Sequence, residues 1–119
     1  MSSEKNKKGR QLLDKLCGTP DGVSSLPEQF GSYTLEHLFG DVWQGKELAL
    51  EERSLITCTI LTALAREPEQ LFHFAAAKRL GVPREKLLGM ITHTAHYAGW
   101  PNAMGAIRSL NKVWPEEDT

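Results

Sequence analysis

Three prolines divide the second half of this chain into helical segments of similar length. Pro68, Pro83 and Pro101 each stand where a helix can begin, because a residue in the first turn needs no backbone N–H. Gly81 and Gly99 precede the second and third of these starts, and glycine is the residue that most readily ends a helix. The predicted helices span residues 68–80, 83–98 and 101–113.

The first half of the chain also shows helical rather than strand periodicity. No segment alternates apolar and polar residues between Asn-Gly or Asp-Gly turns. A short helix over residues 11–16 should end in the Gly- and Pro-containing loop 17–22, and a second helix, weakened by Gly31 and Gly40, should follow over 26–43. A third should begin at Leu50, where acidic residues of the first turn suit the positive end of the helix dipole. The sequence therefore predicts an all-α fold of about six helices.

Length and charge narrow the class of protein further. The chain has 119 residues, which suffices for one hydrophobic core. We expect a polar, frayed segment over residues 1–10, a helical domain over 11–114 and a loose acidic tail over 115–119. The formal net charge is -1, so neither nucleic acid nor an anionic membrane is an expected partner. The run Arg84, Glu85, Lys86 is interpreted as a solvated first turn.

The cysteine pattern and the hydropathy of the sequence indicate in which cellular compartment the protein is expected. Cys17 and Cys58 form neither a CxxC pair nor a disulfide-rich pattern, and no apolar run follows the polar N-terminus to make a secretory signal. The longest uncharged run, residues 87–107, contains histidines, glycines and a proline, which do not suit a membrane span. A cytoplasmic location is expected.

Two segments of the predicted helices carry no charge on any face. Residues 55–65 are uncharged throughout, and a chain this small can hardly cover such a helix by itself. In residues 87–98 one side is leucine, isoleucine and alanine, whereas His93, His96, Tyr97 and Trp100 lie on the other side. One side can pack on the core, but the other needs a subunit interface or a ligand pocket. We therefore expect a homo-oligomer.

Glu69 and His73 are the first candidates for chemistry. They are four residues apart in one predicted helix, so their side chains can meet as a carboxylate–imidazole pair. The carboxylate can orient the imidazole and stabilise its protonated form, which is what a general acid or an oxyanion-stabilising cation requires. The alternative is an ordinary surface pair.

Other residues allow a functional and a structural interpretation. His93 and His96 could join Glu69 and His73 in a metal site, but residues 93 and 96 need not converge on one ion, and no metal is predicted. Arg53 could bind a substrate carboxylate or pair with a structural one. The latter is the simpler interpretation, as is packing for the aromatic residues. Cys58 lacks a second Cys or a cationic neighbour and is assigned to the core.

Two motifs in order resemble the carboxymuconolactone decarboxylase family. H-x3-A-x3-G begins at His73, and H-x-A-x-Y-x-G-x-P-x-A runs from His93 to Ala103. Upstream, Val42-Trp43 and Glu52-Arg53-Ser54-Leu55 resemble the preceding helices of that family, so the likeness covers roughly residues 35–113. The resemblance implies an alkylhydroperoxidase-D-like helical fold, usually assembled as trimers or hexamers.

One departure separates this chain from the peroxidase branch of that superfamily. That branch carries a C-x2-C four residues before the histidine, where this sequence has Arg66 and Glu69. Two sulfurs are needed to form a disulfide, so a dithiol peroxidase is not expected. Glu69 resembles the usual occupant of its position in the decarboxylase branch.

The resemblance implies a cofactor-free and metal-free decarboxylase acting on a small unsaturated lactone acid such as γ-carboxymuconolactone, in the breakdown of aromatic compounds. His73, oriented by Glu69, is the candidate for charge stabilisation and proton delivery. Candidates for holding substrate carboxylates are Arg53 and His93, and candidates for apolar walls are Trp43, Tyr97 and Trp100. Two alternatives stay open: a hydroperoxidase that uses Cys58 alone, and a non-catalytic oligomeric binding protein.

Overall fold

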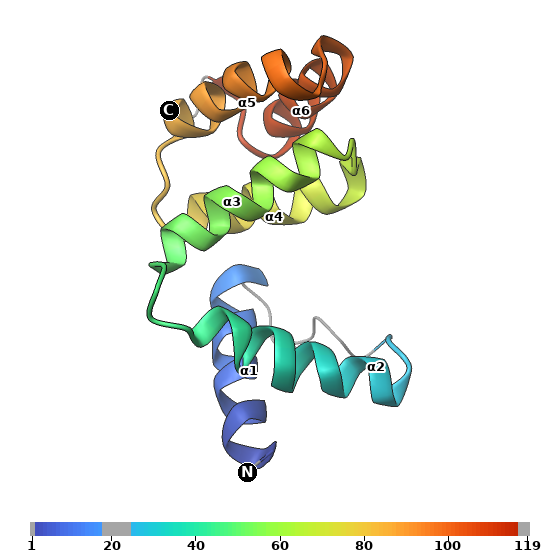
Figure 1. The fold of residues 1–119 in the computed structure, drawn as a ribbon, viewed down its shortest axis with the longest axis vertical. Helices are drawn as coiled ribbons and strands as arrows, with labels where there is room; N and C mark the ends of the chain where they lie inside the picture. Colours follow the sequence, from blue (N-terminus) through green and yellow to red (C-terminus); the bar gives the residue numbers. More distant parts are fainter. Residues whose placement is uncertain (1, 18–24, 117–119) are drawn as a thin grey trace. The chain divides into compact units, whose positions relative to one another are not determined.

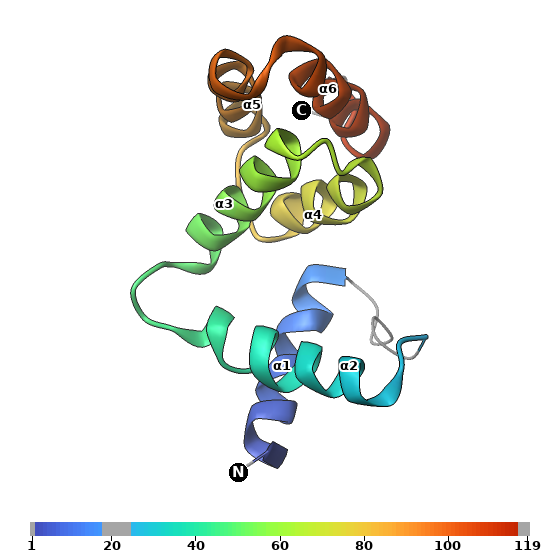
Figure 2. The same ribbon diagram turned by 45° about the vertical axis from the view of Figure 1, so that its right-hand side comes forward.

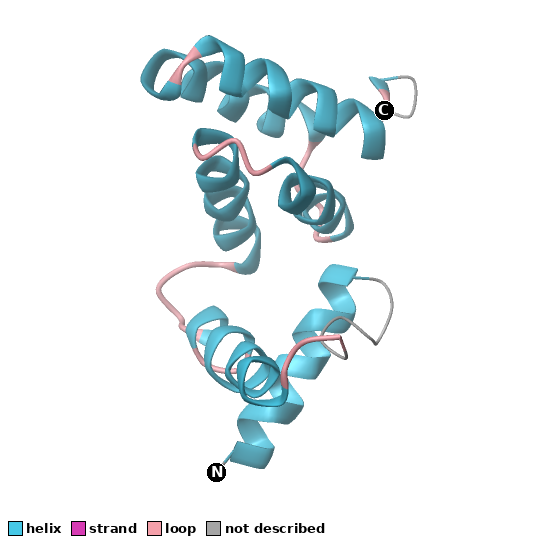
Figure 3. Cartoon of the chain, turned by 90° about the vertical axis from the view of Figure 1, so that its right-hand side faces the viewer, coloured by secondary structure: helices cyan, strands magenta, loops and turns pink. Residues whose placement is uncertain are grey.

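The computed structural model describes residues 2–17 and 25–116, and every regular element within these ranges is a helix (Figures 1 and 3). The all-α prediction is confirmed. The elements group into two units, Met1–Leu50 and Glu51–Thr119, which are described separately here. The predicted loop after Cys17 falls at residues 18–22, and the end of the acidic tail at 117–119; both lie outside the described residues.

The first unit consists of α1 (Ser2–Cys17) and a helical run that packs against it. That run begins as α2 (Glu28–Tyr33), continues as a π-helix, η1 (Thr34–Phe39), and ends in a 3₁₀ turn, η2 (Val42–Gln44). The weakened helix predicted over residues 26–43 is thus present, with three successive hydrogen-bonding patterns. Its inner side and α1 share a small apolar core of Leu12, Leu13, Leu16, Leu35, Phe39 and Trp43.

Helix α1 differs from its prediction because it begins at Ser2 rather than near residue 11. The polar segment 1–10, expected to fray, is helical from residue 2 and makes side-chain contacts. Lys5 Nζ lies 3.4 Å from Asp41 Oδ2, and Asn6 donates a 3.4 Å hydrogen bond to Glu36. At Gly9 the two helices approach so closely that a Cβ would collide with the backbone of Leu35. Contacts with residues distant in sequence therefore extend the helix beyond what its apolar pattern indicates.

The second unit contains the four remaining helices, α3 (Leu50–Ala63), α4 (Glu67–Arg79), α5 (Arg84–Ala98) and α6 (Trp100–Val113) (Figures 1 and 2). The prolines act as predicted: Pro68 and Pro101 lie in the first turns of α4 and α6, and Pro83 immediately precedes α5. The glycines between the helices adopt left-handed backbone angles, with φ of +92° at Gly81 and +108° at Gly99.

The core of this unit lies among α4, α5 and α6, because α6 packs against both of the others. Its fully buried members are small or branched residues around one aromatic ring, namely Phe74, Ala77, Leu87, Ile91, Ala106 and Leu110. Helix α3 adds Cys58 to the cluster. The apolar side predicted for residues 87–98 is confirmed, since Leu87, Ile91 and Ala95 face inward.

The solvated interpretation of residues 84–86 is wrong for Arg84. Its side chain is buried, with Nε donating a 2.8 Å hydrogen bond to the Trp114 carbonyl and a terminal nitrogen donating a 2.6 Å bond to Asn111 Oδ1. Arg84 therefore satisfies a carbonyl group just beyond the end of α6. Lys78 lies over the Trp114 ring, 5.1 Å from its centroid. A charge run read from sequence alone does not reveal a partner thirty residues away.

Over residues 2–17 and 25–116, no helix is both long and apolar enough to cross a membrane.

Candidate functional site

His73 lies in the middle of α4, on the part of that helix that contacts α3. The helix starts at Glu67, and Pro68 in its first turn fixes where the side chains of later turns point. The thiol of Cys58 on α3 donates a 3.5 Å hydrogen bond to the backbone oxygen of His73. The imidazole is half-buried, and its Nδ1 atom is fully shielded from solvent. The backbone that carries the imidazole is thus held by a neighbouring helix.

Burial decides the protonation state of His73. Desolvation lowers the pKa of His73 from 6.5 to about 4, and the negative charge of Glu69 opposes that shift without cancelling it. The imidazole is therefore neutral at pH 7. As expected, Glu69 favours the imidazolium by raising the pKa of His73, but desolvation outweighs this effect in the free site.

Glu69 interacts with two basic groups. It lies one turn before His73 and acts on it electrostatically, and its Oε1 is also 3.4 Å from Arg66 Nε. Both side chains of this ion pair are about half exposed, so the pair is weak and easily screened. The predicted Glu69–His73 pairing is present as a charge interaction across one turn of α4.

Sequence reasoning missed Gln70, whose side chain is fully buried. Its Nε2 donates a 3.0 Å hydrogen bond to the carbonyl of Leu61 near the end of α3. The helical spacing of Gln70, Phe74 and Ala77 was a sequence signal for this position. All three side chains are buried, so a glutamine occupies an inward position of an otherwise apolar stripe. A buried carboxamide three residues before a histidine is a candidate member of the site.

Helix α5 carries two exposed ring pairs. His93 stacks on Tyr97 with ring centroids 5.0 Å apart, and His96 meets Trp100 edge-to-face at 5.6 Å. The His96 ring also makes a 2.8 Å hydrogen bond to the Thr92 carbonyl. In the described part of the chain no hydrogen bond or ring contact joins either pair to His73. The structure thus pairs His93 with Tyr97, and whether they act together with the α4 residues stays a prediction.

Arg53 lies in the first turn of α3 and is half-buried. Its position is on the same helix as Cys58, the residue that contacts the His73 backbone. Whether its guanidinium binds a substrate carboxylate stays a prediction.

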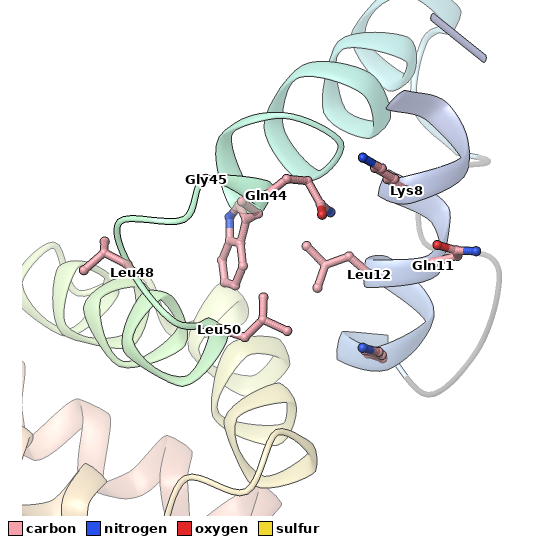
Figure 4. A pocket seen from close by; sticks show the side chains of 9 residues that line it. Lys8, Gln11, Leu12, Gln44, Gly45, Leu48 and Leu50 are labelled. Carbon is pink, nitrogen blue, oxygen red and sulfur yellow. The ribbon is translucent and has the colours of Figure 1, made fainter. Parts of the chain in front are cut away.

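Trp43 belongs to the first unit, whereas His73 belongs to the second. The indole is buried, and its ring is tilted against that of Phe39 with the centroids 5.8 Å apart. It also lines a cavity of about 460 Å³ between α1 and the segment after η2 (Figure 4). The cavity has apolar walls from leucines, and Lys8 and Gln11 of α1 are among its lining residues. Other lining residues are Leu12, Lys15, Gln44, Gly45, Leu48 and Leu50. Trp43 thus lines a pocket within its own unit, and its contact with substrate stays a prediction.

Cys58 has the properties of a core residue. It is fully buried, and burial raises the pKa of its thiol from 9.0 to about 12, against a smaller lowering by the neighbouring Ser54 hydroxyl. A peroxidatic cysteine needs an accessible thiolate, and Cys58 offers neither accessibility nor ionisation at neutral pH. This geometry argues against the hydroperoxidase alternative.

Where the chain is described, no group of three or more His, Cys, Asp or Glu side chains is arranged to hold a metal ion.

The described part of the chain is all-helical and carries a half-buried imidazole on α4. The sequence has no CxxC dithiol. These features define the class of helical protein to which the chain is compared. The model of the carboxymuconolactone decarboxylase family matches residues 28–112. The chain is also 29% identical over 96 residues to a 4-carboxymuconolactone decarboxylase of Acinetobacter baylyi, covering 81% of this chain and 72% of that protein. The chain belongs to the carboxymuconolactone decarboxylase family, as its two motifs predicted.

Proposed function

We propose that this protein is a decarboxylase that acts on a small unsaturated lactone acid such as γ-carboxymuconolactone. The observation that carries the proposal is His73, a neutral half-buried imidazole beside Glu69, in a chain whose relative is named for that reaction. The Arg66 and Glu69 pair at the positions of a redox dithiol supports decarboxylation over peroxide reduction.

The reaction requires stabilisation of negative charge followed by a proton. When the substrate carboxylate leaves as carbon dioxide, the electron pair of the broken C–C bond forms a dienolate with its charge on the lactone carbonyl oxygen. His73 is neutral before substrate arrives, and a bound carboxylate nearby raises its pKa, so the imidazole takes up a proton from solvent. The imidazolium then stabilises the dienolate and delivers the proton to carbon. This sequence needs neither metal nor organic cofactor.

The remaining predicted residues have supporting roles in this proposal. Arg53 and His93 bind the carboxylates of the substrate, and Tyr97 and Trp100 supply apolar walls that exclude water. Glu69 favours the charged imidazole, since its charge already raises the pKa of His73.

The test is carbon dioxide release from γ-carboxymuconolactone by wild type, His73→Ala and Glu69→Gln. His96→Gln is the matched control, because His96 is exposed and bonded to its own helix. We expect turnover to be lost in His73→Ala, reduced in Glu69→Gln and retained in the control. Full turnover by His73→Ala refutes the role of His73, and no turnover by wild type refutes this substrate. A hydroperoxide assay of wild type and Cys58→Ser addresses the peroxidase alternative.

We also propose that the chain assembles as a homo-oligomer, a trimer or a hexamer. The uncharged run 55–65 exposes apolar side chains, among which Ile60 is 52% and Leu64 is 64% exposed, and Tyr97 on α5 is 82% exposed. Such a surface is typical of a buried interface. Sedimentation at micromolar concentration should give a mass of at least three chains, and Ile60→Asp should reduce it. A monomer mass for wild type would refute assembly.

A further inference from the structure

The buried carboxamide of Gln70 uses only its nitrogen in a hydrogen bond. Nε2 donates to the Leu61 carbonyl, which fixes the amide orientation, because the opposite orientation would place two oxygens against each other. The oxygen Oε1 is therefore turned away from Leu61. It is buried, and no described residue donates a hydrogen bond to it. A buried acceptor without a donor is rare and needs an explanation.

His73 presents the complementary case on the same helix. Its Nδ1 atom is buried and has no hydrogen-bond partner among the described residues. Gln70 and His73 are three residues apart in α4, so their side chains are neighbours on the helix surface. Both residues also contact α3, Gln70 through Leu61 and His73 through Cys58. Two unsatisfied polar atoms thus lie on neighbouring side chains at one helix–helix contact.

We propose that Gln70 is a positioning residue for His73, which holds the imidazole as its Nδ1–H tautomer through one ordered water. The water accepts a hydrogen bond from Nδ1–H and donates one to Gln70 Oε1. A single molecule then satisfies both buried atoms, as ordered waters in protein interiors commonly do.

The direction of the two hydrogen bonds from Nδ1–H through water to Oε1 follows from cooperativity. When a donor, a water and an acceptor follow one another in one direction, each hydrogen bond polarises and strengthens the next. A water that donates to both Oε1 and an unprotonated Nδ1 loses that gain. The Nδ1–H tautomer is therefore favoured, although the Nε2–H tautomer is the usual one for a histidine in water.

The consequence for catalysis rests on the proposed function. With its proton on Nδ1, the neutral imidazole presents a lone pair on Nε2, where it can take up the proton that is later delivered to carbon. When His73 becomes charged, Nδ1–H stays bonded to the same water, so the ring keeps its orientation while the proton on Nε2 moves. Gln70 thus keeps the His73 ring in one orientation in both its neutral and its charged state.

The experiment reads the tautomer directly, without substrate. Full-length protein labelled with ¹⁵N at histidine is examined by two-bond ¹H–¹⁵N correlation at pH 7, and the His73 signals are identified by their loss in His73→Ala. The variant is Gln70→Met, which keeps the length but removes both polar atoms. Thr94→Val is the control, because Thr94 is also buried and donates to its own helix, at the Met90 carbonyl.

We expect the Nδ1–H pattern for His73 in wild type and Thr94→Val, and a shift to the Nε2–H form in Gln70→Met. Circular dichroism establishes that each variant is folded. An Nε2–H pattern in wild type, or an unchanged Nδ1–H pattern in folded Gln70→Met, overturns the proposal.

A second measurement separates this inference from the proposed reaction. If wild type releases carbon dioxide, Gln70→Met should lower kcat by about tenfold with KM changed less than about twofold, as expected for the loss of one hydrogen bond to the reacting group. A change in KM alone contradicts the positioning role. If wild type lacks turnover, the tautomer result still decides the role of Gln70.

Discussion

Acidification should destabilise this protein through His73 in a defined pH range. In the folded chain burial lowers the pKa of His73 from 6.5 to about 4, so between these values the unfolded chain binds a proton that the folded chain does not. The contribution of the neutral His73 to the free energy of unfolding is therefore fully present above pH 6.5. It is lost progressively as the pH falls from 6.5 through about 4. From these two pKa values the free energy of unfolding should fall by about 2 kcal/mol at pH 5 and about 3 kcal/mol at pH 4.

The assay compares urea unfolding of wild type and His73→Gln at pH 7 and pH 5. The chain concentration is held constant, because association would otherwise change the apparent stability. Other groups titrate equally in both proteins, so the difference between them isolates His73. We expect wild type to lose about 2 kcal/mol more than His73→Gln between the two pH values. Equal losses in the two proteins would refute the argument that burial controls this imidazole.

Three further predictions concern separate contacts. Glu69→Gln should lower the pKa of His73 further, because Glu69 raises it; NMR titration checks this, and an unchanged or higher pKa contradicts the charge interaction. Arg84→Met should lower the free energy of unfolding by about 2 kcal/mol, because it leaves the buried Trp114 carbonyl without its donor; a loss under about 0.5 kcal/mol in urea contradicts it. Gly99→Ala should destabilise by about 1–3 kcal/mol through backbone strain at a φ of +108° rather than through collision, and thermal unfolding that matches wild type would disprove this.

The second unit was largely predictable because its signals are local. A proline in a first turn and a glycine after a last turn act through the backbone of a few residues, so their effect does not depend on distant contacts. The limits predicted around Pro68, Pro83, Gly81 and Gly99 accordingly agree with α4 and α5 to within a residue or two.

The features that were missed depend on partners distant in sequence. Helical periodicity shows which residues point inward, but it does not show what a polar residue meets there. Arg84 finds its partner at Trp114, and Gln70 finds Leu61 on another helix. The pairing of Glu69 with His73 follows from spacing, whereas the neutral state of the imidazole depends on how much of α4 is covered. The Glu69–His73 pair was therefore predictable from its spacing, whereas the protonation state of His73 was not.

Gly9 and Gly40 have a consequence for how this chain can vary. Each lies where a side chain would collide with the backbone of the other helix, at Leu35 for Gly9 and at Lys5 for Gly40. Gly9 follows Lys7 and Lys8 in a segment whose polar residues are typical of a solvent-exposed surface that tolerates substitution. It should instead tolerate fewer replacements than most of the leucines in the core, since a leucine has smaller apolar substitutes and a glycine has none. Random mutagenesis with selection for folded protein would thus find the most restricted site of the N-terminal helix among its most hydrophilic residues.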